Sequence, residues 1–183
     1  MIRSLCISPA LLAAALSCMA QETPFKATIT CPSFAPPPVV SAAPGGSIVK
    51  LDDTCFWTNL PFAGPGAKSR LIGTGVLFGA AGTFAAQGYD VATLANGGQF
   101  LAQWDESGSS TGSNIRYHIQ SGTGSLAGIT GSAAIACPPA KIGAVTVNGA
   151  AVNAPALVVV CEVTGTYRIP KPAATAPAVP SKK

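Results

Sequence analysis

Hydrophobic and polar residues alternate with a period of two in almost every segment of the chain where a pattern can be read. The segments "FKATITC" (25–31), "GQFLAQW" (98–104) and "NIRYHIQ" (114–120) all alternate in this way. Because successive side chains of a strand point to opposite faces, this period predicts half-buried β-strands. Beyond residues 1–20 no segment shows a convincing helical period, so we expect an all-β fold.

The stretch 117–137, "YHIQSGTGSLAGITGSAAIAC", places glycines at 122, 124, 128 and 131 between short apolar runs. These glycines would destabilise a helix, and a flexible linker would not need the Ile, Leu and Ala between them. The stretch therefore predicts a β-hairpin with bends or bulges at its glycines. Four further segments complete a set of about eight strands: "SRLIGTGVLF" (69–78), "GTFAAQGYDVATL" (82–94), "AVTVNG" (144–149) and "ALVVVCEVTGTYRI" (156–169). At this number of strands a small antiparallel barrel encloses side chains or one small ligand.

The first twenty residues, "MIRSLCISPALLAAALSCMA", have Arg3 near the start, an apolar middle and the small residue Ala20 at the end. This pattern predicts a secretory signal peptide, and its apolar run is too short to span a bilayer as a mature helix. In the alternative reading "ALSC" is similar to a bacterial lipoprotein signal, and the chain is lipid-anchored through Cys18. No later segment is apolar over the length of a membrane helix, so we expect a soluble protein that is secreted or periplasmic.

Charged residues make up only 10% of the 183 residues, and the formal net charge is +4 at pH 7. One basic residue lies in the leader and three lie in the Pro/Ala-rich end "KPAATAPAVPSKK", while the remaining charges balance. A basic face for nucleic acid is therefore not expected. We divide the chain into a signal peptide (1–20), one barrel domain (21–168) and a disordered tail (169–183).

The chain has six cysteines, of which two lie in the leader and four, Cys31, Cys55, Cys137 and Cys161, remain after it. In an exported protein an even number indicates disulfides. Two segments begin with Cys-Pro, end on Cys and have the same separation, which favours the pairs 31–55 and 137–161. A pair 31–161 at the barrel seam is the alternative. With no C-x-x-C and only one histidine, we expect no metal.

Two glycine-containing motifs imitate catalytic or nucleotide-binding sequences. "GSSTG" around Ser110 fits the G-x-S-x-G pattern, but a nucleophile elbow needs a strand before the turn and a helix after it. Here "DESGSSTGSN" (105–114) predicts a long mobile hairpin loop followed by a strand. "GTGVLFG" (73–79) imitates a dinucleotide motif, but it continues as a strand where that motif requires a helix.

Few ionisable residues converge in the sequence. Arg116 and His118 share one strand face and would form an anion or proton-transfer pair if that face lined the barrel. The alternating residues Ile115, Tyr117 and Ile119 look like the core-facing set, so we expect the pair to face solvent.

Asp52 and Asp53 are adjacent in the sequence and would face opposite sides of a strand, so they cannot form a paired-carboxylate site. We expect them to form a turn before Cys55.

The glycine-rich hairpin "YHIQSGTGSLAGITGSA" resembles the G-G-T-G-x-[FL]-x-G-[AI]-x-G hairpin of the allene oxide cyclase and dirigent barrel superfamily. Upstream, "DDT" (52–54) and "GPGAKSRLIGTGVLF" (64–78) are similar in order and spacing to the acidic start and the S-K-x-V-G-x-x-Q-G strand of dirigent proteins. Gly97 to Phe100 lies where these proteins often place a glycine-rich turn. The resemblance covers about residues 47–135.

The resemblance implies an eight-stranded antiparallel barrel with a hydrophobic cavity, in a family whose enzymes cyclise or couple reactive small molecules without a cofactor. It also implies that a dimer or trimer can form. After the aspartates the sequence departs from the family with Cys55, Phe56 and Trp57, so no catalytic residue is transferred. We therefore expect either a non-catalytic module that binds a small apolar ligand or a partner, or a cofactor-free isomerase or cyclase. A cavity lined by an aspartate, Arg116 or His118 would favour the enzyme.

Overall fold

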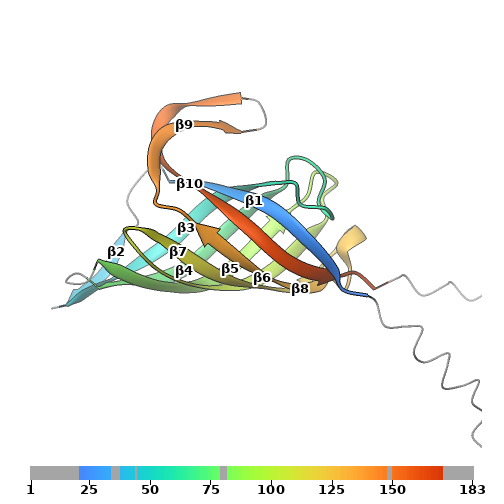
Figure 1. Ribbon diagram of the computed structural model, residues 1–183, viewed down its shortest axis with the longest axis horizontal. Helices are drawn as coiled ribbons and strands as arrows, with labels where there is room; N and C mark the ends of the chain where they lie inside the picture. The colour runs from blue at the N-terminus through green and yellow to red at the C-terminus, as the bar shows by residue number, and fades with distance from the viewer. Residues whose placement is uncertain (1–20, 34–37, 44, 79–81, 148–149, 171–183) are drawn as a thin grey trace, which may run out of the picture.

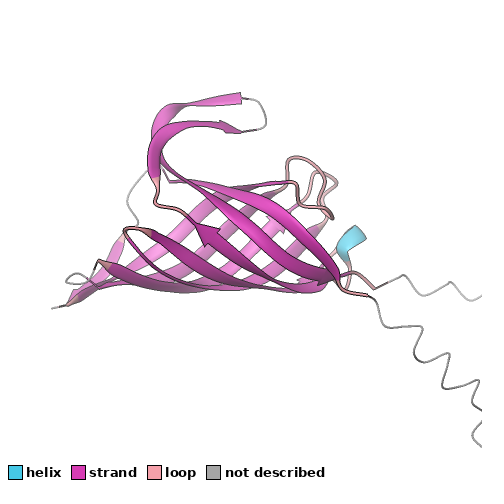
Figure 2. Ribbon diagram, viewed as in Figure 1, coloured by secondary structure: helices cyan, strands magenta, loops and turns pink. Residues whose placement is uncertain are grey.

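The computed structural model describes residues 21–33, 38–43, 45–78, 82–147 and 150–170. The expected signal peptide, with Cys18, and the expected tail from residue 171 onward lie outside these residues. The described elements are almost all strands (Figure 2). They are β1 (Thr23–Ser33), β2 (Val39–Ala43), β3 (Gly46–Thr58), β4 (Lys68–Phe78), β5 (Thr83–Thr93), β6 (Gln99–Ser109), β7 (Gly112–Gly122), the 3-10 helix η1 (Gly124–Leu126), β8 (Thr130–Cys137), β9 (Lys141–Val147) and β10 (Ala150–Arg168).

Eight of these strands close into an antiparallel barrel. Strands β3 to β8 pair in sequence order, β8 pairs with β10, and β1 pairs with both β10 and β3. Figure 1 shows β1 lying beside β10 where the first and last strands of the barrel meet. The predicted all-β barrel of about eight strands is confirmed.

Strands β2 and β9 lie outside the closed barrel. β2 pairs with the first part of β3, and β9 pairs with the first part of β10 to form an arm that rises away from the barrel (Figure 1). The expectation that "AVTVNG" supplies a barrel strand was wrong. Residues 144–147 do lie in a strand, β9, but its only pairing partner among the described strands is the projecting part of β10.

One end of the barrel is plugged by aromatic side chains. Phe62, from the loop between β3 and β4, packs against Phe25, Phe100 and Tyr167 with ring centroids 5.8, 5.7 and 4.6 Å away. The 3-10 helix η1 lies at the same end, where its Leu126 is buried (Figure 2). Apolar burial therefore closes this end of the barrel.

Both disulfides link neighbouring strands close to the place where the barrel closes. Cys31–Cys55 joins β1 to β3, and Cys137–Cys161 joins β8 to β10. The favoured pairing is confirmed, and the alternative 31–161 is excluded. Two disulfides indicate an oxidising, non-cytoplasmic location. Among the described residues no helix is long and apolar enough to cross a membrane.

The segment 105–114, expected to be a long mobile loop, forms the ends of two paired strands. β6 runs to Ser109 and β7 begins at Gly112, so the turn contains only Ser110 and Thr111. Gly112 has a φ of 135°, and a Cβ there would lie 2.6 Å from the carbonyl oxygen of Cys137. The prediction of a long loop failed because polar side chains can also occupy strands, and here they still alternate between the two faces of the barrel.

Glycines on β4 and β5 make room for the largest side chain of the interior. Trp104 of β6 pairs with Gly88 of β5, which pairs with Gly73 of β4. A Cβ on Gly73 would lie 2.6 Å from Cζ2 of Trp104 and would also collide with the backbone oxygen of Gln87. The fully buried indole therefore extends across the neighbouring strands.

We predict that Gly73→Ala destabilises the protein much more than Gly75→Ala. Both residues face inward on β4, but a Cβ on Gly75 would meet Cγ2 of Val49 at 3.2 Å, a contact that small shifts can relieve. The expected loss in unfolding free energy is about 3 kcal/mol for Gly73→Ala and less than about 1 kcal/mol for Gly75→Ala. Urea unfolding of the two variants measures this difference, and equal losses would contradict the packing described here.

Candidate functional site

The end of the barrel opposite the aromatic plug contains a cavity of about 280 Å³. On β1, the plug residue Phe25 lies near the start of the strand and the cavity residue Cys31 near its end. All four disulfide cysteines line the cavity wall. The other lining residues are Ile29, Ser33, Leu51, Asp53, Leu71, Trp104, Glu106, Ile115, Tyr117, Ile135, Ala140, Leu157 and Val159. The wall is thus mainly apolar, with a few polar groups, as in most small-ligand sites.

Two carboxyl groups face this cavity, Asp53 from β3 and Glu106 from β6. Burial, together with the neighbouring charge of Asp52, raises the pKa of Asp53. Burial also raises the pKa of Glu106, with a smaller contribution from the charge of Asp53, although a hydrogen bond donated by the Ser113 hydroxyl acts in the opposite direction. Both carboxyl groups therefore hold a proton more tightly than an exposed carboxyl group does.

The two adjacent aspartates face opposite sides of β3, as expected. Asp52 faces outward and accepts two hydrogen bonds of 2.9 Å from Arg70, which lower its pKa, while Asp53 faces the cavity. The expected turn at this position was wrong, because both residues lie within the strand. Their position before Cys55 is set by barrel pairing with Ile72 and Leu71 on β4 and not by local turn chemistry.

A third carboxyl group lies deeper inside the barrel. Asp90 is fully buried and accepts a hydrogen bond of 2.6 Å from the hydroxyl of Tyr117, whose ring lines the cavity. Burial raises the pKa of Asp90 to about 6, although hydrogen bonds from Tyr117 and Ser69 favour its charged form. Ser69 in turn accepts a hydrogen bond of 3.0 Å from Nε1 of Trp57. These four residues form a hydrogen-bonded cluster between the cavity and the plug.

Two buried polar atoms have no hydrogen-bond partner within the described part of the chain. They are Oδ1 of Asp90 and Nε1 of Trp104. Buried polar groups in folded proteins are nearly always hydrogen-bonded, to protein, water or ligand. Trp104 belongs to the cavity wall, but it has no exposed surface, so its unpaired N–H is buried behind the wall.

The pair Arg116 and His118 faces away from the cavity. Both side chains are exposed on β7, and Arg116 donates a hydrogen bond of 2.8 Å to Asp105. The alternating residues Ile115, Tyr117 and Ile119 are buried, so the expected core-facing set is confirmed. The motif around Ser110 lies in a hairpin turn with a strand on either side and does not form a nucleophile elbow.

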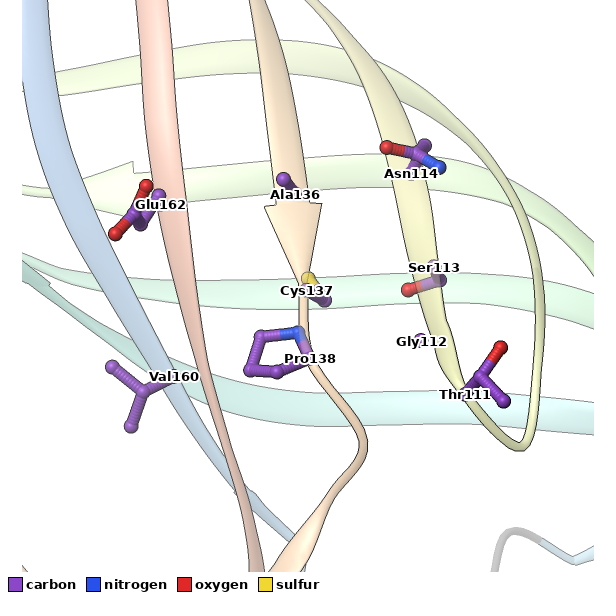
Figure 3. Close-up of a pocket in the computed structure, with 9 residues that line it drawn as sticks. All are labelled: Thr111, Gly112, Ser113, Asn114, Ala136, Cys137, Pro138, Val160 and Glu162. Carbon is purple, nitrogen blue, oxygen red and sulfur yellow. The ribbon is translucent and has the colours of Figure 1, made fainter.

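A second hollow, of about 500 Å³, lies where β7, β8 and β10 run side by side. Figure 3 shows Asn114 and Glu162 on either side of the small Ala136, with Thr111 and Pro138 nearer the turn. Asn114 and Glu162 are exposed and belong to the outer face of the barrel. This hollow is polar and open, so the interior cavity is the better candidate site.

The carboxyl groups of Glu106 and Asp90 were not recognised as site residues from the sequence. Glu106 was assigned to the expected loop, although it continues the inward-facing set Ala102 and Trp104 on β6. Asp90 lies in the inward-facing set of β5, between Gly88 and Ala92. A polar residue at a core position of an alternating strand is the signal that identifies both.

No known protein family matches the chain, and no curated protein matches it either. Among the described residues no three His, Cys, Asp or Glu side chains come together in a way that could hold a metal ion. The site is therefore interpreted from its own geometry.

We predict that Asp90 makes the stability of the protein depend on pH. Because its pKa is raised in the folded state, the folded protein binds the proton more tightly than the unfolded chain does. The resulting stabilisation is complete below about pH 4 and is lost as the pH rises through about 6, a change of about 3 kcal/mol. Asp90→Asn keeps an acceptor for Tyr117 without a charge and should remove the contribution of Asp90 to the pH dependence.

Urea unfolding of wild type and Asp90→Asn between pH 4 and pH 8 measures the effect. Asp105→Asn, on the outer face, serves as the control and should keep the wild-type pH profile. Parallel profiles for wild type and Asp90→Asn would show that Asp90 does not titrate as described.

Proposed function

We propose that the protein is an exported binding barrel that holds a small, mainly apolar ligand in its interior cavity. The observation that carries this proposal is the cavity itself, which is lined mainly by apolar side chains and lies opposite an end closed by aromatic rings. Proteins fill their interiors closely, so a cavity of about 280 Å³ next to a well-packed plug is typical of a ligand site.

Export is supported by the leader pattern and by the two disulfides. The sequence of residues 1–20 fits a signal peptide, and disulfides persist in secreted and periplasmic proteins. In the proposed role the protein acts outside the cytoplasm, either free or anchored through Cys18.

A cofactor-free isomerase or cyclase of the allene oxide cyclase or dirigent type is the second candidate. The observation that favours it is the presence of Asp53 and Glu106 in the cavity wall with raised pKa values. A raised pKa lets a carboxyl group hold a proton more readily, donate it to a substrate and accept one later, which is the chemistry of general acid and base catalysis. The glycine-rich hairpin that resembles this superfamily supports the same candidate.

We predict that mature protein purified from its own compartment carries a small molecule. Native mass spectrometry should show an added mass that disappears when the protein is denatured. An empty protein would contradict the binding proposal.

Incubation of the released molecule with fresh protein then separates the two candidates. A binding protein returns it unchanged, whereas an enzyme converts it to an isomer. The enzymatic role further requires that Asp53→Asn and Glu106→Gln stop the conversion while the outward-facing Asp52→Asn and Asp105→Asn do not.

A further inference from the structure

The arm formed by β9 and the first part of β10 has two strand edges that pair with no other described strand. β9 pairs only with β10, and before Leu157 β10 has β9 as its only partner among the described strands. Figure 1 shows these two strands rising away from the barrel. A free edge presents a row of backbone N–H and C=O groups that can pair with another strand.

The two edges of the arm differ in how they are protected against such pairing. On β10, residues 153–155 lie opposite the single residue Ala144 of β9, and Pro155 has no backbone N–H. Bulges and prolines are common devices that keep a strand edge from pairing. β9 (Lys141–Val147) has neither, and its only charged residue is Lys141 at one end. The edge of β9 is therefore the one open to a partner strand.

The composition of the arm is that of a strand pair covered by other parts of a protein. Residues 142–160 contain no charged side chain. Ile142 on β9 is 81% exposed, the largest exposed fraction among the large hydrophobic side chains that the structure describes. A two-stranded hairpin alone is marginally stable in water, whereas three or more strands with an apolar face are stable. Further strands beside β9 would therefore stabilise the arm.

A second copy of β9 fits this edge better than the rest of the chain does. The segment 171–183 carries Pro172, Pro177 and Pro180, which would interrupt the hydrogen bonds of a pairing strand. Two identical strands, in contrast, can pair antiparallel about a two-fold axis.

Full overlap of two β9 strands brings no like charges together. The strand has seven residues, so Ala144 of one copy opposes Ala144 of the other at the two-fold axis. Lys141 of each copy then opposes Val147, and the two lysines lie at opposite ends of the pair. Such a pairing also turns two marginal hairpins into one sheet of four strands.

We propose that the β9 edges of two copies pair antiparallel and join two barrels into a dimer. The strands follow each other in the order β10, β9, β9, β10, with the two-fold axis between the two β9 strands. Because each arm projects from its barrel, the two barrels do not need to touch. This inference concerns a partner surface and does not depend on the ligand proposed for the cavity.

Sedimentation velocity of mature protein with both disulfides intact tests the proposal over a series of concentrations. We expect a dimer whose fraction rises with concentration. Ile142→Lys/Thr146→Lys should raise its dissociation constant about tenfold or more, because positions 142 and 146 oppose each other in the full overlap. The matched control, Val40→Lys/Ala42→Lys, adds the same charge at exposed apolar positions of β2 and should keep the wild-type constant.

Hydrogen exchange of the backbone amides shows whether β9 is the strand that pairs. Amides of β9 that do not bond to β10 exchange rapidly in a monomer and slowly in the proposed dimer. Protection of residues 141–147 should therefore rise with concentration in the wild type and in the β2 variant. It should stay at the monomer level in Ile142→Lys/Thr146→Lys.

A wild-type protein that stays monomeric over the whole series would overturn the inference, without any variant having to fold. Equal weakening in both double variants, or weakening in the β2 variant alone, would place the contact elsewhere. A dimer whose β9 amides exchange at the monomer rate would show that the copies associate through another surface. Native protein recovered with its β9 edge paired to a strand of a different protein would overturn self-pairing as well.

Discussion

Closure of the barrel by β1 is the constraint on which the rest of the structure depends. This strand pairs along its whole length with β10 and near its middle with β3, so the first and last strands of the barrel become neighbours. A closed barrel has no free edge, and its register fixes which side of every strand faces inward. The disulfide Cys31–Cys55 links β1 to β3, and Cys137–Cys161 links β10 to β8, so each of the two junction strands is tied covalently to its other neighbour.

Register explains why adjacent acidic residues have opposite environments. Asp52 and Asp105 face outward and pair with arginines, at exposed positions where such ion pairs contribute little to stability. Asp53 and Glu106, one residue further along each chain segment, face the cavity and have raised pKa values. The aromatic plug stabilises the other end by apolar burial, which allows the cavity end to contain polar groups at a cost to stability.

Much of the fold could be predicted from the sequence because barrel strands repeat one simple pattern. Alternation identified the strands and the inward set around Tyr117, and equal spacing of the cysteines identified the disulfides. The segment 105–114 and the pair Asp52 and Asp53 were misread because polar residues there resemble turn sequences. Their true positions depend on partners on the neighbouring strand, such as Arg70 for Asp52 and Arg116 for Asp105.

The pairing of β9 and the surroundings of the site residues could not be predicted either, because they too depend on partners on other strands. Nothing in the local sequence of "AVTVNG" distinguishes a strand that pairs inside the barrel from one that pairs only with the projecting part of β10. Likewise, the environments of Asp90 and Glu106 are set by another strand, because Tyr117 and Ser113 of β7 donate hydrogen bonds to them. Alternation shows that these residues face inward, but only the closed barrel shows what they face.

The most direct test of this account is a pH titration of the carboxyl carbons by ¹³C nuclear magnetic resonance. The account predicts that Asp52 titrates below the ordinary value of an aspartate, that Asp53 and Glu106 titrate above their ordinary values, and that Asp90 titrates at about pH 6. If Asp53 and Glu106 instead titrated like exposed carboxyl groups, they would not be buried in the cavity wall, and the proposed site would be wrong.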